Sequence, residues 1–275
     1  MKSIVKKFSI PDEIAKIAET LENKGFESYL VGGCVRDLLL GKKPKDWDIT
    51  TNAAPEKIQE VFKDSFYENE YGTVGVVTSN TNDETLKVVE VTPYRRESAY
   101  SDKRRPDRVE FAGKLEDDLK RRDFTINAIA LRLIRETKTG EYEAEIEDCY
   151  EGQADLEKKI VRTVGNPEER FAEDALRLVR AVRIAVELDF EIDTDTRRAI
   201  TKHAGELRHI AAERIRDEFV RILLSENPKR GLEISHELGI LRLVMPELLE
   251  GKGVAQNQAH AFDVLEHTLR TLAHA

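Results

Sequence analysis

The fold of this chain is decided by YLVGGCVRD at residues 29–37 and by DWDIT at residues 46–50. The apolar run before the two glycines predicts a strand, and the run after them predicts a helix that ends at Gly41. Gly32 and Gly33 then lie in a strand-to-helix turn, where backbone amides can approach phosphate groups without an intervening Cβ. Such a turn also needs glycine for conformational reasons alone, so the glycines by themselves do not indicate a ligand.

The second stretch predicts a strand in which Asp46 and Asp48, two residues apart, point to the same face. Trp47 and Ile49 point to the opposite face and look like core. Two adjacent carboxylates repel each other, so a pair held on one face needs a cation, and oxygen ligands of this kind suit Mg²⁺. We therefore expect Asp46 and Asp48 to be catalytic residues and metal ligands.

A third catalytic carboxylate is expected from a neighbouring strand. After a predicted helix at residues 55–62, residues 73–79 and 85–91 predict two strands joined by a polar turn. Glu90 lies in the second of these strands, and a strand beside residues 46–50 would direct it towards the same face. The alternative is an exposed glutamate on an edge strand.

Composition limits the class of protein. A chain of 275 residues can form two domains, and its net charge of −9 argues against a uniformly basic surface, although basic clusters occur at residues 95–108 and 120–122. No basic start leads into an apolar run, and no run reaches the ~18 residues of a membrane span, so we expect a cytoplasmic protein without membrane contact. Cys34 and Cys149 fit no disulfide framework or metal-ligand spacing.

The second half of the chain is expected to be all-α. Asn166 is predicted to cap a helix that has Pro167 at its first position. Apolar residues then recur at three- and four-residue spacing over residues 171–188 and again over residues 211–224.

Four motifs give a resemblance to a known family. The pattern Gly-Gly-x-x-Arg-Asp, followed by Asp-x-Asp at residues 46–48, resembles the signature of the polymerase-β nucleotidyltransferase superfamily. RRDFTINA at residues 121–128 and EDALR at residues 173–177 resemble later motifs of the class II tRNA nucleotidyltransferase (CCA-adding enzyme) and poly(A) polymerase family. The motifs follow the order of that family.

The resemblance implies an α+β fold and an activity. The expected fold is a mixed-sheet, polymerase-β-like catalytic head at residues 1–140, followed by an all-α neck and body at residues 141–250 for base recognition and RNA binding. Residues 251–275 resemble the truncated start of an HD-like domain. The implied reaction is template-independent, Mg²⁺-dependent addition of C and A from CTP and ATP to the 3′ end of tRNA, with release of pyrophosphate.

The resemblance also implies nucleotide-binding residues. Arg122 would contact the triphosphate, while Asp123 and Asn127 would bond the ribose hydroxyls. The alternative for residues 121–123 is a salt bridge at the start of a helix. The implied nucleotide-binding set is Gly32, Gly33, Arg36, Arg122, Asp123, Asn127, Asp174, Arg177, Arg180 and Arg183.

Asp174 and Arg177 are expected on one helix, three residues apart and therefore adjacent on its surface. Such a pair is usually a surface salt bridge of small energetic value. The family suggests base reading instead, because a carboxylate can accept from the amino group of C or A while a guanidinium donates to the neighbouring ring nitrogen. Uracil and guanine present the reverse pattern. Arg180 and Arg183 continue around the same helix.

Two further segments carry expectations. Residues 94–106 form a polar stretch that we expect to be mobile, and the family associates a flexible loop at this place with addition of the terminal A. Residues 256–268 resemble the opening of an HD-type domain. His260 and His267, seven residues apart, can share a helix face, but two histidines make an incomplete metal site.

The sequence leaves several alternatives open. Within the family, A-only addition and poly(A) synthesis are harder to exclude than unrelated functions. An aminoglycoside-type nucleotidyltransferase would share the two aspartates but has no need for a base-reading pair. A non-catalytic RNA-binding module would not need paired carboxylates. The oligomeric state is not predicted.

Overall fold

The computed structural model describes residues 4–68, 72–79, 82–98, 108–111, 113–256 and 261–274. The chain divides into two compact units. Unit 1 comprises the chain up to Ser98 together with Arg108–Lys158, and unit 2 contains the chain from Lys159 onward. Most of the polar stretch at 94–106, from residue 99 on, and His260 lie outside the described residues.

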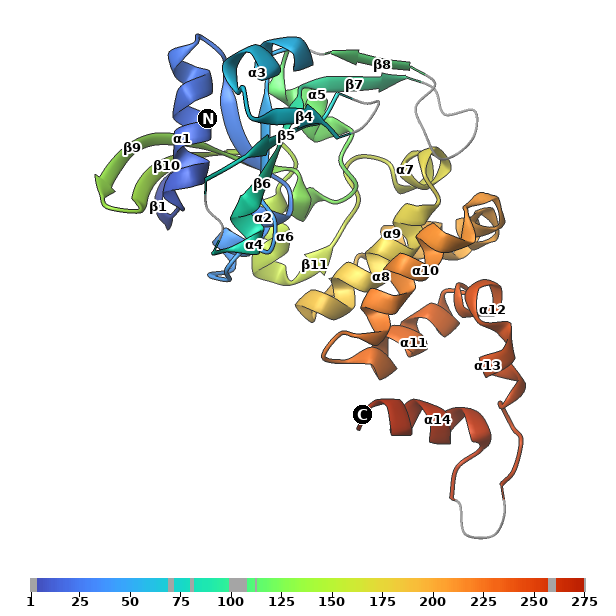
Figure 1. Cartoon of the computed structure of the whole chain (residues 1–275). Coiled ribbons are helices and arrows are strands. Elements are labelled where there is room, and N and C mark those ends of the chain that lie inside the picture. Colours follow the sequence, from blue (N-terminus) through green and yellow to red (C-terminus); the bar gives the residue numbers. More distant parts are fainter. Residues whose placement is uncertain are drawn as a thin grey trace. The chain divides into compact units, whose positions relative to one another are not determined.

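Unit 1 is built on an eight-stranded mixed sheet (Figure 1). In spatial order its strands are β1 (Ile4–Ser9), β10 (Glu141–Asp148), β9 (Ile129–Lys138), β2 (Ser28–Val31), β3 (Asp48–Thr51), β6 (Val88–Pro93), β5 (Val74–Val77) and β4 (Ser65–Tyr67). Every neighbouring pair is antiparallel except β3 and β6, which are parallel. A separate antiparallel pair is formed by β7 (Arg95–Ser98) and β8 (Arg108–Phe111).

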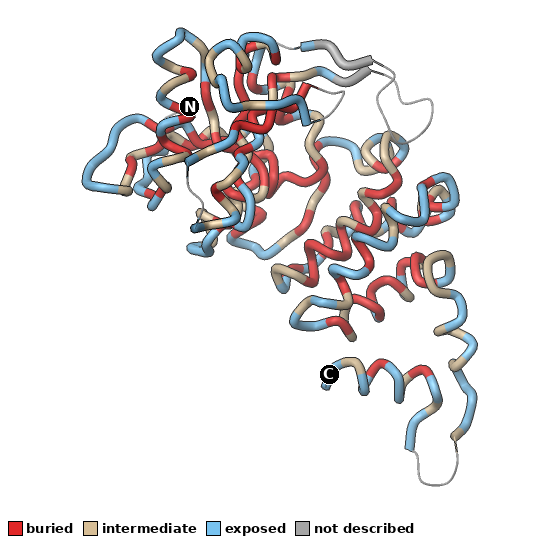
Figure 2. Tube along the Cα trace, viewed as in Figure 1, coloured by how far each residue is buried: buried red, intermediate tan, exposed pale blue. Residues whose placement is uncertain are grey.

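The centre of the sheet follows the alternation expected of half-buried strands. Val89 and Val91 of β6 are fully buried, while Glu90 between them is exposed. Ile49 of β3, the register partner of Val91, is also buried. Figure 2 shows buried residues along these central strands. Because side chains alternate between faces, the polar face of β3 and β6 is fixed by the apolar face opposite it.

The helices of unit 1 are mostly short. They are α1 (Asp12–Asn23), α2 (Gly33–Leu39), α3 (Pro55–Val61), α4 (Glu84–Lys87), α5 (Leu115–Lys120) and α6 (Gly152–Lys158), with a 3₁₀ turn η1 at Thr125–Asn127. The predicted helices after Gly33 and at residues 55–62 are confirmed. The predicted strand at residues 85–91 begins too early, because the Asp83 side chain accepts from the Thr85 amide and caps the one-turn helix α4.

The chain beyond residue 140 continues the sheet. Residue 140, the predicted end of the head, falls in the turn between β9 and β10. Because β10 pairs with β9 and β1 along its length, it belongs to the same hydrogen-bonded layer. The compact unit around the sheet extends to Lys158.

Unit 2 is almost entirely helical. Its helices are α7 (Pro167–Glu173), α8 (Leu176–Leu188), α9 (Thr194–His203), η2 (Ala204–His209), α10 (Ala212–Leu223), α11 (Pro228–Glu237), α12 (Leu241–Val244), α13 (Pro246–Glu250) and α14 (Val264–Leu272). Its core is α8, against which α10 and α11 pack (Figure 1). The all-α prediction missed one short parallel pair, β11 (Ile160–Val161) with β12 (Glu191–Ile192).

The predicted α+β class, with a mixed sheet followed by helices, is confirmed. The predicted cap is also present, because the Asn166 side chain accepts from the Glu168 amide at the start of α7. Among the described residues, none of the helices combines the length and apolar character that crossing a membrane requires.

Candidate active site

The backbone of the Gly32–Gly33 turn lies close to the side chains of Asp46, Asp48 and Arg122. Gly32 has a φ of 80°, which L side chains rarely adopt. A Cβ at Gly32 would lie 3.0 Å from the Asp48 carboxylate and 3.2 Å from the Arg122 guanidinium. A Cβ at Gly33 would lie 3.6 Å from the Asp46 carboxylate. Gly32 is therefore favoured both by its backbone conformation and by the close approach of Asp48 and Arg122, whereas the 3.6 Å distance at Gly33 is an ordinary van der Waals contact.

Asp46 and Asp48 both flank this turn, but they are not two residues of one strand as predicted. The strand β3 begins at Asp48, and Asp46 lies in the bend before it. Trp47 is buried, and its carbonyl accepts from the Glu90 amide at 3.3 Å, so the segment still follows β6. Within the described residues, neither aspartate forms an ion pair or a side-chain hydrogen bond.

Desolvation and neighbouring negative charge disfavour ionisation of Asp48 and Glu90. Burial raises the pKa of Asp48 to about 6, against the opposing effect of Arg122, and Asp46 raises it further. Glu90 is the register partner of Asp48 on the parallel strand β6, so the two side chains share a face, as predicted. Desolvation, followed by the charge of Asp48, raises the pKa of Glu90 to about 7.

Glu68 adds to this negative region, and sequence reasoning missed it. It follows β4, and its backbone amide donates a hydrogen bond to the Thr73 carbonyl at 3.0 Å. Its charge raises the pKa of both Asp48 and Glu90. The chain places Glu68 in an irregular segment without a motif, so no sequence signal pointed to it.

The donor set fits a divalent cation that brings some of its own ligands. In the part of the chain that the structure describes, no group of three or more His, Cys, Asp or Glu side chains forms a ready-made metal cage. Mg²⁺ is usually bound through one or two carboxylates, with water and substrate phosphates completing its octahedron. Asp46 and Asp48, without internal partners, match that requirement.

Arg122 is held beside the carboxylates by a buried acid. The Asp118 side chain is 0% exposed and lies 2.7 Å from Arg121 and 3.1 Å from Arg122. Burial alone would raise the pKa of Asp118, but the two guanidinium groups together hold it below its ordinary value. The Nε atom of Arg122 is buried without a hydrogen-bond partner among the described residues. Both arginines therefore follow the end of α5 and pair with Asp118, which lies outside the triplet at residues 121–123, and this contact orients Arg122 next to Asp48.

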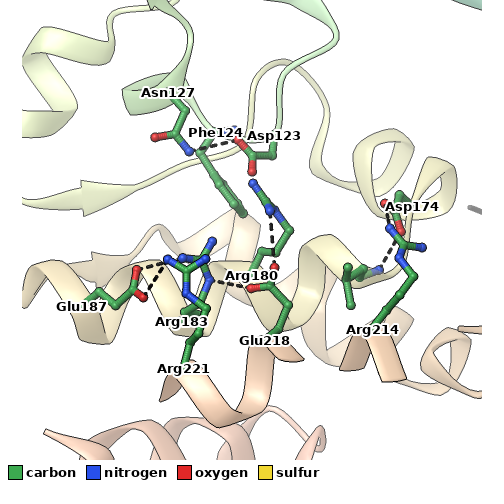
Figure 3. Close-up of polar contacts among 11 residues, drawn as sticks. Asp123, Phe124, Asn127, Asp174, Arg180, Arg183, Glu187, Arg214, Glu218 and Arg221 are labelled. Carbon is green, nitrogen blue, oxygen red and sulfur yellow. Dashed lines mark hydrogen bonds and ion pairs between the residues drawn. The ribbon is translucent and has the colours of Figure 1, made fainter. Parts of the chain in front are cut away.

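Three predicted nucleotide-binding residues form one chain of hydrogen bonds. Arg36 donates to Asn127 at 3.0 Å and pairs with Asp37 at 2.8 Å. Asn127 in turn donates to Asp123 at 3.1 Å, as Figure 3 shows. Both Asp123 and Asn127 are buried. Motifs distant in sequence thus meet at the end of α2 and η1.

In unit 2, the predicted Asp174–Arg177 helix pair is wrong. Asp174 has extended backbone angles and separates α7 from α8, because its side chain accepts from the Leu176 amide at 3.0 Å. Its other oxygen lies 3.2 Å from Arg214 of α10 (Figure 3). Arg177 instead contacts Glu173 at 2.7 Å, four residues before it.

Arg180 and Arg183 lie on α8 as predicted, but both are paired with carboxylates (Figure 3). Glu218 of α10 contacts Arg180 at 3.4 Å and Arg183 at 2.5 Å. Arg183 is only 5% exposed and also pairs with Glu187 at 2.9 Å. The sequence pattern gave Arg214, Glu218 and Glu187 no role as partners of these residues, whereas the four-residue spacing of Glu173 and Arg177 was a signal that could have been read.

Two family models match the chain. Residues 28–162 match the Poly A polymerase head domain, and residues 189–251 match the model described as the probable RNA and SrmB-binding site of polymerase A. A CCA-adding enzyme of Ligilactobacillus salivarius is 47% identical over 229 residues, which are 82% of this chain and 53% of that protein. The chain thus spans about half the length of the curated relatives it matches.

Solved structures of CCA-adding enzymes and a tRNA nucleotidyltransferase are similar in fold to this chain. The crystal structure of the Bacillus stearothermophilus CCA-adding enzyme in complex with CTP has a TM-score of 0.72 and 37% identity, covering 84% of this chain and 53% of that one. A tRNA nucleotidyltransferase complexed with a primer tRNA and an incoming ATP analog has a TM-score of 0.69 and 26% identity. That match covers 93% of this chain and 67% of the other.

Proposed function

We propose that this chain, which belongs to the tRNA nucleotidyltransferase and poly(A) polymerase family, adds C and A to the 3′ end of tRNA from CTP and ATP. The observation that carries the proposal is the placement of Asp46 and Asp48 against the Gly32–Gly33 turn, beside Arg122. Two carboxylates without internal partners next to a guanidinium suit a polyphosphate that arrives with its cations.

The family depends on divalent metal ions, and we assign Mg²⁺ to this chain, held by Asp46 and Asp48. When bound, such ions lower the pKa of the attacking 3′-hydroxyl and neutralise charge on the α-phosphate and pyrophosphate. Glu90, on the same sheet face as Asp48, would hold the hydroxyl end of the site. Arg122, fixed by Asp118, would bind the triphosphate without losing its orientation.

The remaining nucleotide contacts follow the motif residues. The Gly32–Gly33 turn and Arg36 would border the phosphates, and Asp123 and Asn127 would bond the ribose hydroxyls. Asp123 and Asn127 are already oriented by their mutual hydrogen bond. Pre-orientation limits the side-chain entropy that is lost when the nucleotide binds.

For base choice we propose Asp174 as the acceptor for the amino group of C or A and Arg177 as the donor to the ring nitrogen. Each residue has a supporting partner of its own: Arg214 and the Leu176 amide hold Asp174, and Glu173 holds Arg177. A carboxylate oxygen has two lone pairs, so an oxygen that bonds one partner can still accept from a base. Arg180 and Arg183 would act through the same helix, with Arg183 as a buried positioning residue.

The wider assignments follow from this reaction. The catalytic head would be the sheet unit, which extends past the boundary predicted at residue 140 to Lys158. The helical chain from there to residue 250 would be the neck and body that recognise the base and RNA, and residues 251–275 would be the start of an HD-like domain. The cytoplasm would supply the tRNA, CTP and ATP.

The proposal is tested by incubating the purified protein with tRNA that ends at the discriminator base, at CC or at CCA. Each substrate receives CTP alone, ATP alone or both, and the products are separated at single-nucleotide resolution. We expect CC from CTP alone, A on the CC substrate, CCA from both, and no extension of CCA. Addition of A alone, or continued A addition to CCA, would replace the proposal by an A-adding enzyme or a poly(A) polymerase. Asp46→Ala serves as the inactive control.

A further inference from the structure

A cavity lies in unit 1, and neither Gly32 nor Gly33 lines it. Its volume is about 590 Å³, and it is bordered by the β1–α1 junction and by the loop between α2 and β3. The apolar part of its lining is Phe8, Ile10, Pro11, Leu38, Pro44 and Trp47. A cavity of this size, with an apolar wall and a few polar groups, has the character of a small-molecule site.

Trp47 forms part of the cavity wall and has an unmet hydrogen-bonding requirement. It is only 3% exposed, and its indole Nε1 has no hydrogen-bond partner among the described residues. A buried donor without a partner disfavours the folded state, so an oxygen that reaches it forms a stabilising hydrogen bond. Because Nε1 is covered, an oxygen reaches it only if the loop at residues 41–47, which has no helix or strand, shifts.

The charge of the cavity rim favours an anion. Three lysines, Lys7, Lys42 and Lys43, border the cavity, against one acid, Asp12. Lys43 is engaged by Asp83 at 2.8 Å, and Lys7 lies 3.6 Å from Glu141. Lys42 is exposed and forms no ion pair within the described part of the chain. It is therefore the cation most available to a ligand.

We propose that this cavity binds a small amphipathic anion, with an apolar body against Leu38 and Pro44, an oxygen that accepts from the Trp47 indole, and its charge beside Lys42. The anionic oxygen belongs to a carboxylate or a phosphate, which present the same acceptor to the indole. The site is separate from the proposed nucleotide site, although Trp47 lies between Asp46 and Asp48 in the chain. Binding at this cavity therefore does not depend on the function proposed above.

The single tryptophan of the chain makes the test direct, because its indole gives one N–H resonance in protein labelled with ¹⁵N-tryptophan. Benzoate and phenyl phosphate are the first two probes, because each has both an apolar ring and an anionic oxygen. Toluene has the apolar ring alone, and inorganic phosphate has the anionic oxygen alone. We expect a saturable shift of the indole resonance with one or both aromatic anions. Toluene and inorganic phosphate should bind at least about tenfold more weakly, since each lacks one contribution of roughly 1.4 kcal/mol or more.

Variants separate this site from non-specific binding. Lys42→Gln should weaken binding of the aromatic anion by about threefold to tenfold, in keeping with the loss of one partly exposed charged contact. Lys24→Gln, at an equally exposed lysine outside the cavity, should leave affinity unchanged. Trp47→Phe, followed by calorimetry, should weaken binding by about tenfold through loss of the donor. The absence of a saturable shift with both anions, or equal effects of Lys42→Gln and Lys24→Gln, would overturn the proposal.

Discussion

Asp46 and Asp48 in unit 1 differ from the arginines of α8 in unit 2 in how their charge is balanced. Neither aspartate has an ion-pair partner among the described residues. In contrast, Arg177 contacts Glu173, and Arg180 and Arg183 share Glu218. Asp46 is exposed and Asp48 is partly buried. A charge that is partly removed from water without a partner disfavours the folded state, whereas a paired and hydrogen-bonded charge is tolerated.

The difference separates two uses of charge. Asp46 and Asp48 leave a deficit of positive charge that is met from outside the chain, as by a cation, whereas Asp118 in the same unit is neutralised by Arg121 and Arg122. The arginines of unit 2 are neutralised from within, so their side chains are oriented before any ligand arrives. Each of the following predictions tests one side of this comparison.

The largest effect is expected from removal of divalent ions. Chelation should reduce nucleotide addition to background, because Asp46 and Asp48 alone repel a triphosphate. Mg²⁺ at about a hundredfold over its dissociation constant should also raise the free energy of unfolding of the wild type by about 2.7 kcal/mol. Asp46→Asn should reduce this Mg²⁺ stabilisation. An equal Mg²⁺ effect in urea unfolding of both proteins would contradict the assigned ligands.

Asp118→Asn should lower the free energy of unfolding by roughly 3 kcal/mol at neutral pH, because it leaves Arg121 and Arg122 without their buried counter-charge. The pKa of Asp118 is below its ordinary value in the folded state. Its stabilising effect is therefore present above pH ~4 and is lost as pH falls through the folded-state pKa. Urea unfolding of variant and wild type at pH 7 and pH 3 checks this. A difference in the free energy of unfolding between wild type and Asp118→Asn that is larger at pH 3 than at pH 7 would contradict a lowered pKa of Asp118.

Glu218→Gln tests the internally neutralised side of the comparison. It should lower the free energy of unfolding by about 2 kcal/mol, because Arg183 is buried and, among the described residues, is then left with Glu187 as its ion-pair partner. Asp195→Asn, which breaks the exposed pair with Arg198, is the matched control and should leave unfolding unchanged within error. Similar losses in both variants would mean that burial does not distinguish these pairs.

Gly32→Ala should be the smallest of these effects. Gly25, with a φ of 84° and no atom within 4 Å of an added Cβ, is a matched glycine for backbone strain alone. Gly32→Ala should lower the free energy of unfolding by about 1 kcal/mol more than Gly25→Ala, since its Cβ meets Asp48 and Arg122. It should also impair nucleotide addition, which Gly25→Ala should spare. If Gly32→Ala and Gly25→Ala lower the free energy of unfolding and nucleotide addition equally, the close approach of Asp48 and Arg122 to Gly32 has no effect.

The parts of the fold that the sequence predicted depend on short-range pattern. The strand, glycine turn and helix at residues 28–39 follow from local apolar spacing, and the position of Glu90 beside Asp48 follows from strand alternation. The regular apolar spacing over residues 171–188 concealed the break at Asp174, because a side-chain cap interrupts the helix without disturbing that spacing.

The partners of the charged groups could not be predicted in the same way. Arg214 and Glu218 reach Asp174 and Arg183 from α10, some 40 and 35 residues away in the chain. Only the packing of α10 on α8 brings them together, and no local pattern encodes it. Glu173 was within reach of sequence reasoning, since residues four apart on a helix are neighbours.

The central claim is that Asp46 and Asp48 serve a ligand rather than the fold. It is tested most directly by Asp48→Asn, measured for CTP incorporation into tRNA lacking its 3′ end and for urea unfolding at pH 8 without divalent ions. Burial raises the pKa of Asp48 to about 6, so above that pH its charge disfavours the folded state. We predict that incorporation falls by more than about a hundredfold, as even outer-shell partners of metal ligands contribute 10–100-fold, while stability is kept or increased. Incorporation within about tenfold of wild type, or a parallel loss of stability, would contradict the claim.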